Sequence, residues 1–186
     1  MEPLLFILGF ALIIALSIIA YLANREHDVS DPSDNTKPYA DEKTRALLIE
    51  TLNKMGGKIC DIDDEDGRIS YDYQGYRFLF YSADDSLFIT VCYPWWYEIP
   101  LDNIDQLIIM RKVINEVNHF EHCSVFYTID EEDGVAGLHS KKSLVFVSKL
   151  AALDQYLQSI FLDCLNGERR FLAAMEKEKA KEEINV

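Results

Sequence analysis

A long apolar run near the start of the chain restricts most strongly what the protein can fold into. From Pro3 to Ala23 there is no charged residue, and the run holds 6 Leu, 5 Ile and 2 Phe. An apolar helix of about 20 residues matches the ~30 Å hydrocarbon core of a bilayer. Each Leu, Ile or Phe adds ~0.3–0.6 kcal/mol in favour of insertion. The run therefore predicts a single transmembrane anchor over residues 1–23, which contacts the bilayer through residues 3–23.

Two other structures fit this run less well. A cleaved signal peptide has a basic start and small residues at positions −3 and −1 of the cut, but Glu2 is the only charge here. Cleavage after Ala23 places Tyr21 at −3, and cleavage after Ala20 places Ile18 there. A buried core helix is usually amphipathic, whereas this run is apolar on all sides.

Basic residues follow the run, and none precedes it. Arg25, Lys37, Lys43 and Arg45 lie on its C-terminal side. Since basic residues near a span mark its cytoplasmic end, the bulk of the chain is predicted to lie in the cytoplasm.

The net charge is −14, from 18 basic and 32 acidic residues. Such a surface repels nucleic acid, whose binding depends on neutralising phosphates. It also repels anionic lipid headgroups, so the predicted helix, not the domain surface, must hold the protein at a membrane. A basic protein partner is the kind that this charge favours.

The four cysteines are widely spaced and form no C-x-x-C pair; they are Cys60, Cys92, Cys123 and Cys164. In a cytoplasmic domain this pattern predicts free, partly buried thiols. An even number of cysteines also permits two disulfides if the domain faces an oxidising compartment.

The rest of the chain reads as a linker followed by one mixed domain. Residues 24–40 have no apolar period and contain two prolines, which predicts a flexible linker. A first helix is expected from an N-cap at Asp41 to Gly56-Gly57, followed by three or four antiparallel strands between Lys58 and Ile99. A second helix is expected from Asp102.

After the second helix come two further strands, "CSVFYTI" and "SLVFVS", and a last helix that starts near Lys149. Asn166-Gly167 is expected to end this helix, which leaves residues 167–186 as a charged helical tail. The fold class is therefore α+β over residues 41–166, in the order α-β-β-β(-β)-α-β-β-α, with helices packed on one face of an antiparallel sheet.

Two acidic stretches, "DIDDEDG" at 61–67 and "TIDEEDG" at 128–134, resemble each other. A calcium loop of the EF-hand type needs an oxygen ligand at position 1 and Glu at position 12. With Gly67 at position 6 these places hold Ile62 and Tyr73, and with Gly134 they hold Ile129 and Ser140. Asp-Gly is typical of hairpin turns, so both stretches are predicted to be turns without a metal.

The second half of the domain, "VINEVNHFEHCSVFYTIDEEDGVAG…SLVFVS", resembles the YbjN-type bacterial proteins, whose fold is that of type III secretion chaperones. The resemblance rests on a helix with the pair Asn115 and Asn118, then a strand, a Gly-ended acidic turn and another strand. It covers about residues 44–165 and leaves the apolar run and "PWWY" unexplained. It implies a non-enzymatic binding or regulatory protein, often dimeric. Together with the anchor predicted from the apolar run, this gives an expected location at the bacterial cytoplasmic (inner) membrane.

The stretch "YPWWYEIP", from Tyr93 to Pro100, is the leading candidate for a binding site. Because proline lacks the N–H that a ladder needs, the stretch is not expected in a central strand. Neighbouring residues of an extended chain point to opposite faces, so one tryptophan is expected to stay exposed. Exposed Trp and Tyr are favoured anchors at interfaces, and the predicted protein-binding residues are Tyr93, Trp95, Trp96 and Tyr97. Packing in the core is the alternative.

His119, His122 and Cys123 form the only tight group of metal-capable side chains, and a fourth ligand such as His139 has to come from elsewhere. The same residues leave open a membrane-bound metal-dependent sensor or a Cys/His hydrolase that uses Cys123. Cys123 lies in an apolar strand without the glycine neighbours typical of a nucleophile. No catalytic residue, cofactor or metal is therefore predicted. The favoured function is a membrane-anchored adaptor that localises a protein partner, and a homodimer without a client is the alternative.

Overall fold

The computed structural model describes residues 43–120 and 122–184. The predicted anchor at 1–23 and linker at 24–40 lie outside these ranges. No helix within the described ranges is both long and apolar enough to cross a membrane.

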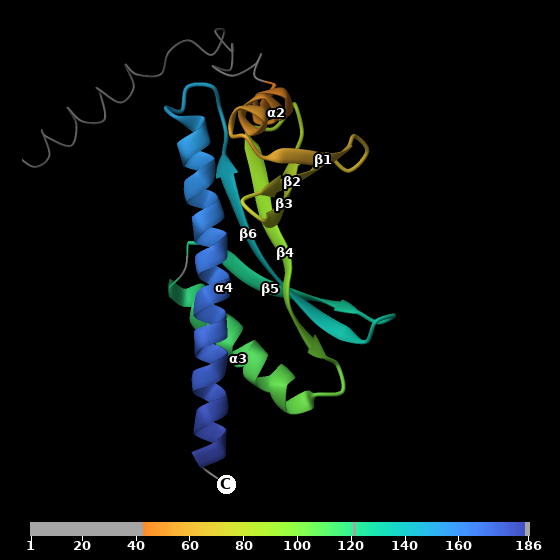
Figure 1. Cartoon of the computed structure of the whole chain (residues 1–186), viewed down its shortest axis with the longest axis vertical. Helices are drawn as coiled ribbons and strands as arrows, with labels where there is room; N and C mark the ends of the chain where they lie inside the picture. The colour runs from red at the N-terminus through yellow and green to blue at the C-terminus, as the bar shows by residue number, and fades with distance from the viewer. Residues whose placement is uncertain (1–42, 121, 185–186) are drawn as a thin grey trace, which may run out of the picture. The chain divides into compact units, whose positions relative to one another are not determined.

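The element order agrees with the expected α+β pattern, with four strands in the first group. The elements are α2 (Thr44–Lys54), β1 (Lys58–Asp63), β2 (Arg68–Tyr73), β3 (Tyr76–Ser82), β4 (Phe88–Pro100), α3 (Ile104–Phe120), β5 (Ser124–Asp130), β6 (Val135–Val145) and α4 (Leu153–Ile184). They form one six-stranded antiparallel sheet in the order β1-β2-β3-β4-β6-β5 (Figure 1). β6 begins directly after Gly134, earlier than the predicted "SLVFVS".

The core lies between one face of the sheet and the three helices, and it has two parts. The upper cluster joins α2 and the first half of α4 to β2, β3 and β4, with Tyr71, Phe78 and Phe80 fully buried. The lower cluster joins α3 and the second half of α4 to β4, β5 and β6. α4 therefore takes part in both clusters.

α4 continues through Gly167, so the predicted helix end at Asn166-Gly167 is wrong. A Cβ at Gly167 would lie 2.8 Å from Cys123 Sγ and 3.2 Å from Ser140 Oγ, so glycine allows the helix to approach the sheet closely. Beyond it, Phe171 and Met175 are buried in the lower cluster.

β4 contradicts the expectation that proline excludes "PWWY" from a central strand. Its ladder with β6 is interrupted between Tyr93 and Tyr97, and β3 pairs only with Ile89 to Cys92. Pro94 falls in this irregularity, where no ladder bond needs its missing N–H.

The helix starts differ from the expected ones by a few residues. Asp41 lies outside the described residues, and Lys43 holds the N-cap position of α2 without a side-chain hydrogen bond. α3 starts after Asn103, whose Oδ1 accepts a hydrogen bond from Gln106 N at 3.1 Å, and not at Asp102. Of the pair Asn115 and Asn118, Asn118 exchanges hydrogen bonds of 2.9 and 2.7 Å with the backbone of Val125 and so ties α3 to β5.

Candidate interaction face

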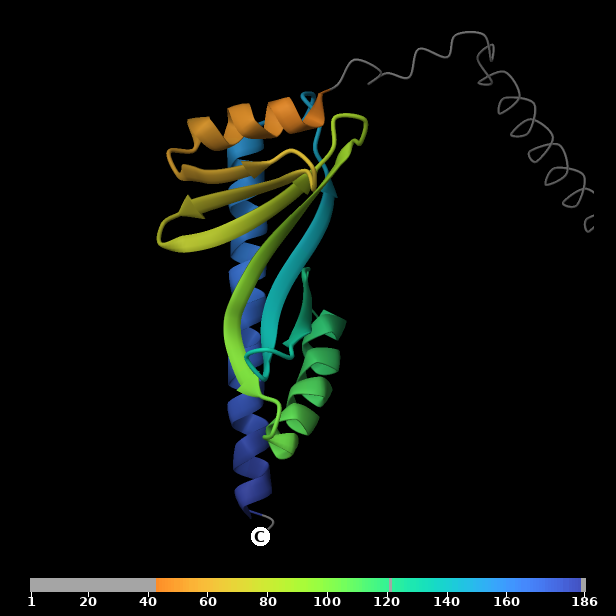
Figure 2. The same cartoon turned by 90° about the vertical axis from the view of Figure 1, so that its right-hand side faces the viewer.

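The face of the sheet opposite the core carries a row of exposed apolar side chains, and we call it the open face. Its exposed members are Phe88 (57%), Trp95 (44%), Val145 (41%) and Tyr81 (40%). In the view of Figure 2 the strands lie in front of α4, with β4 and β6 at the centre. Four large apolar side chains of neighbouring strands are thus presented on one surface.

The strand register shows how these side chains adjoin. Phe88 lies opposite Val145, and Tyr81 lies opposite Thr90 on β4. The apolar row therefore begins at the β3–β4 end of the sheet and continues across β4 to β6.

Specific contacts fix the position of Trp95 on this face. Its backbone has φ of +51°, and its N–H donates a hydrogen bond of 3.2 Å to His139 Nδ1. The Trp95 and His139 rings meet edge to face with centroids 5.1 Å apart. A Cβ at Gly137 would lie 1.9 Å from the Trp95 ring, so the indole lies against backbone that only glycine leaves uncovered.

His139 is buried although it belongs to the open face. Its Nε2 shares a 2.7 Å hydrogen bond with Thr128 Oγ1, and its ring stacks on Phe126. Because Nδ1 accepts the Trp95 N–H, the ring proton of the neutral form sits on Nε2 and is donated to Thr128. Burial lowers the pKa of His139, which favours this neutral form.

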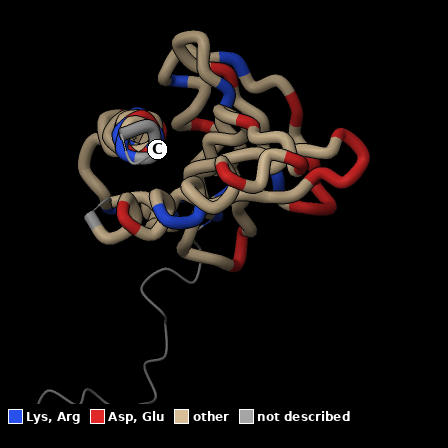
Figure 3. Tube along the Cα trace, turned by 90° about the horizontal axis from the view of Figure 1, so that it is seen from below, with Lys and Arg blue, Asp and Glu red and all other residues tan. Residues whose placement is uncertain are grey.

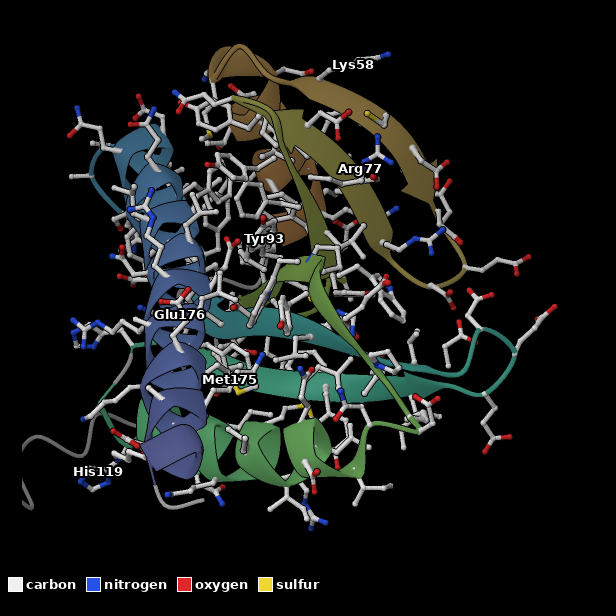
Figure 4. The ribbon with its side chains drawn as sticks, turned by 60° about the horizontal axis from the view of Figure 1, so that its bottom comes forward. Lys58, Arg77, Tyr93, His119, Met175 and Glu176 are labelled. Atoms are coloured by element: carbon white, nitrogen blue, oxygen red, sulfur yellow. The ribbon has the colours of Figure 1, made fainter. Side chains whose placement is uncertain are left out.

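The other three predicted binding residues lie on the core face. Trp96 and Tyr97 pack near Phe171 of α4, with ring centroids at 5.3 and 6.2 Å. Tyr93 projects from β4 toward α4 (Figure 4) and packs at 5.5 Å from Phe78. Burial, and then the neighbouring Glu168, raise the pKa of Tyr93 to about 12. Only Trp95 of the predicted four is therefore exposed.

The two acidic stretches are turns with the same local geometry. Asp63 Oδ1 accepts hydrogen bonds from the backbone N–H groups of the second and third residues after it, at 3.0 and 3.3 Å. Asp130 Oδ1 does the same at 3.0 Å in both cases. Gly67 and Gly134 close the turns with φ of +67° and +66°, a conformation that favours glycine.

Both turns project to the side of the sheet away from α4 (Figures 1 and 3). Between them they expose six carboxylates, those of Asp64, Glu65, Asp66, Glu131, Glu132 and Asp133. The hairpin tips therefore give the open-face side a negative rim.

A hollow of about 730 Å³ lies where the first acidic turn meets the open face. Tyr81 and Phe88 contribute aromatic surface, while Glu65, Asp66 and Asp84 contribute charge. Arg45 of α2 holds the turn in place, because its guanidinium donates to Asp63 O at 3.0 Å and to Asp64 Oδ1 at 2.9 Å. The hollow thus joins apolar and acidic surface.

Sequence reasoning missed Tyr81, Phe88 and Val145. The alternation of residues in "YRFLFYS" already separated Tyr81 from the core residues, because Phe78 and Phe80 occupy even positions and Tyr81 an odd one. Parity alone separates the two faces of a strand, but it does not tell which face a helix covers. That depends on how α2 and α4 pack against the whole sheet.

Cys123 and His139 lie on opposite faces of the sheet. Cys123 is buried in the upper cluster, and its Sγ donates to Asp163 O at 3.2 Å. His119 and His122 are exposed, and His119 lies near the end of α3 (Figure 4). Among residues 43–120 and 122–184, no group of three or more His, Cys, Asp or Glu side chains is arranged to hold a metal.

No protein-family model matches the chain, and no curated protein matches it either. Solved structures show distant similarity of the fold. An uncharacterized protein from Methanothermobacter thermautotrophicus has a TM-score of 0.49 and 11% identity over 73% of this chain and 98% of its own. The HopA1–SchA chaperone–effector complex gives 0.43 and 15%, over 68% and 91%. YbjN from E. coli, a proposed transcription regulator, gives 0.43 and 10%, over 74% and 92%.

Proposed function

We propose that this protein is a non-enzymatic adaptor that binds a basic protein partner on its open face. In this proposal residues 1–23 anchor it in the bacterial cytoplasmic membrane, the domain lies in the cytoplasm, and binding localises the partner at the membrane. The binding role is argued from the surface of the α+β domain, whereas the membrane anchor is argued from the apolar sequence run alone.

The observation that carries the proposal is that aromatic and acidic surface lie together. Phe88, Trp95 and Tyr81 supply large side chains of the kind that dominate binding energy at interfaces. The two acidic turns lie on the same side (Figure 3). The first of them borders Tyr81 and Phe88 in one hollow, so a partner that covers these rings also meets carboxylates. Burying acids against a neutral or acidic surface costs free energy, so the arrangement favours a basic partner.

Site-specific photo-crosslinking in native membranes tests this proposal. A photoreactive phenylalanine analogue placed at Phe88 is expected to crosslink the full-length protein to one distinct basic protein. The matched control carries the same analogue at Ile108, which is 61% exposed on α3 and outside the open face.

The outcomes separate the alternatives. Crosslinking to a basic protein from Phe88 and not from Ile108 supports the adaptor. Crosslinks only between two copies of the chain support the homodimer and exclude a client on this face. Equal crosslinking from both positions excludes a specific role for the open face. Recovery of the same partner by a variant lacking residues 1–24 would separate binding from anchoring.

A further inference from the structure

Two buried cysteines from distant parts of the chain meet inside the upper cluster. Cys123 precedes β5 and is 4% exposed, while Cys164 lies on α4 and is fully buried. Both side chains belong to the same cluster, and the Cys123 sulfur contacts the turn of α4 that carries Cys164. This contact has no part in the proposed function.

The backbone around the pair confirms how close the elements are. Cys123 Sγ donates to the carbonyl oxygen of Asp163, the residue immediately before Cys164. One turn further along α4, a Cβ at Gly167 would lie 2.8 Å from the same sulfur. Cys123 Sγ therefore lies against the helix segment from Asp163 to Gly167, which contains Cys164.

We propose that Cys123 and Cys164 form a reversible disulfide that links β5 to α4 under oxidising conditions. The two other cysteines are separated from this pair. Cys60 is exposed on β1, and Cys92 belongs to the open face of the sheet. Of the possible disulfide pairings, the structure thus favours Cys123 with Cys164.

The bond forms with balanced chemistry when hydrogen peroxide is the oxidant. The Cys123 thiol loses its proton and its sulfur attacks one peroxide oxygen, so that the O–O bond breaks. The hydroxide that leaves takes up the proton, which gives a sulfenic acid and one water. The Cys164 sulfur then attacks the Cys123 sulfur, the S–O bond breaks, and a second water leaves with the Cys164 proton.

The reaction is expected to be slow in the folded domain. The hydrogen bond with Cys123, together with burial, raises the pKa of Cys164 above its usual range. Since the thiolate is the reactive form, the raised pKa slows the step in which the Cys164 sulfur attacks. Thiol–disulfide exchange reverses the bond when a small dithiol is present.

Peptide mass spectrometry of the purified full-length protein in mild detergent tests the proposal. After treatment with hydrogen peroxide and alkylation of remaining thiols in denaturant, a linked pair of peptides containing Cys123 and Cys164 is expected. The linked pair must disappear on reduction. The Tm of the oxidised protein is expected to rise by on the order of 10 °C, because the bond closes a long loop.

Two variants serve as matched controls. Cys92→Ala is expected to keep the linked peptides and the Tm shift, because Cys92 lies on the other face. Cys164→Ala is expected to lose both. If Cys164→Ala does not fold, the reversal of the wild-type Tm shift by a dithiol supplies the second measurement. Full alkylation of Cys123 and Cys164 after peroxide treatment overturns the proposal, as does a Tm shift that Cys164→Ala retains.

Discussion

His139 is the residue whose protonation state matters most to the open face. Protonating Nδ1 removes the acceptor that binds the Trp95 N–H, and that bond holds Trp95 in its left-handed backbone conformation. Lys141 lies nearby over the Phe126 ring, 4.8 Å from its centroid, and adds positive charge to the same region. The position of Trp95 on the open face therefore depends on the neutral form of His139.

Stability is expected to fall at mildly acidic pH. The pKa of His139 is lowered in the folded state, so between that pKa and the unfolded value of about 6.5 the unfolded chain binds the extra proton. The contribution is fully present above pH ~6.5 and is lost as pH falls through the lowered pKa. The Tm of the wild type, measured between pH 8 and pH 5, checks this expectation. His139→Asn, whose Oδ1 can accept the Trp95 N–H, is expected to lack this part of the decline.

Gly167→Ala is expected to destabilise the domain, although alanine favours a helix by ~1 kcal/mol. The new Cβ would meet Cys123 Sγ at 2.8 Å, and overpacking of this kind costs ~1–3 kcal/mol. Urea unfolding measures the difference. The neighbouring exposed residue provides the control, because Asn166→Ala is expected to change stability by ~0.5 kcal/mol or less. A Gly167→Ala variant more stable than the wild type contradicts the close approach.

Among the elements, α4 is the one that unites the domain. Its first half packs with α2 and its second half with α3, and it contacts β4, β5 and β6. Near its C-terminal end, buried Glu178 accepts hydrogen bonds from Lys112 of α3 and from Lys181. The segment after Gly167 is thus attached to the rest of the fold.

Phe171→Ala is expected to destabilise the domain by ~3–5 kcal/mol, the usual cost of removing a fully buried phenylalanine. Glu176→Ala, on the exposed side of the same helix, is expected to stay within ~0.5 kcal/mol. Chemical unfolding of both variants supplies the measurement. Equal effects from the two would show that residues 167–184 do not stabilise the core.

Local sequence patterns predicted which helices, strands and turns form better than they predicted the residues at which these elements begin and end. The turn at Gln74-Gly75, between β2 and β3, and the two acidic turns were predictable because a tight turn depends on its own few residues. The continuation of α4 past Gly167 was not predictable in this way, since the reason for that glycine is a sulfur atom more than forty positions earlier in the chain. The prediction that Pro94 excludes a central strand was wrong for a similar reason. The pairing of β3 with β4 ends before Pro94, and the local sequence does not reveal this.

In the whole domain, the acidic turns and the exposed apolar residues of the open face lie on the side of the sheet away from α4 (Figures 1 and 3). The expectation that one tryptophan of the patch stays exposed holds for Trp95, whereas Trp96 and Tyr97 point to the face that α4 covers. The acidic turns were assigned correctly as turns. Their common direction is a property of the twisted sheet, which no short stretch of sequence contains.

Reversing charge on one turn is expected to slow binding of the basic partner. Glu65→Lys with Asp66→Lys leaves the backbone hydrogen bonds to Asp63 in place, so the turn keeps its shape. The association rate with the crosslinked partner is expected to fall ~10-fold at low salt, and by less at high salt. Surface plasmon resonance at several salt concentrations measures this dependence. A Glu176→Lys control on α4 is expected to change the rate little, and equal effects would remove the role of the turns.

The position of α4 in the chain has a consequence for synthesis of the protein. Strands β1 to β6 leave the ribosome before the helix that completes both halves of their core. Until residues near Met175 emerge, the apolar face of the nascent sheet has no α4 to cover it. Such exposed intermediates are prone to aggregation. Translation that stops within the last elements is therefore expected to leave a chain that cannot complete its fold and becomes a client of the cell's own chaperones.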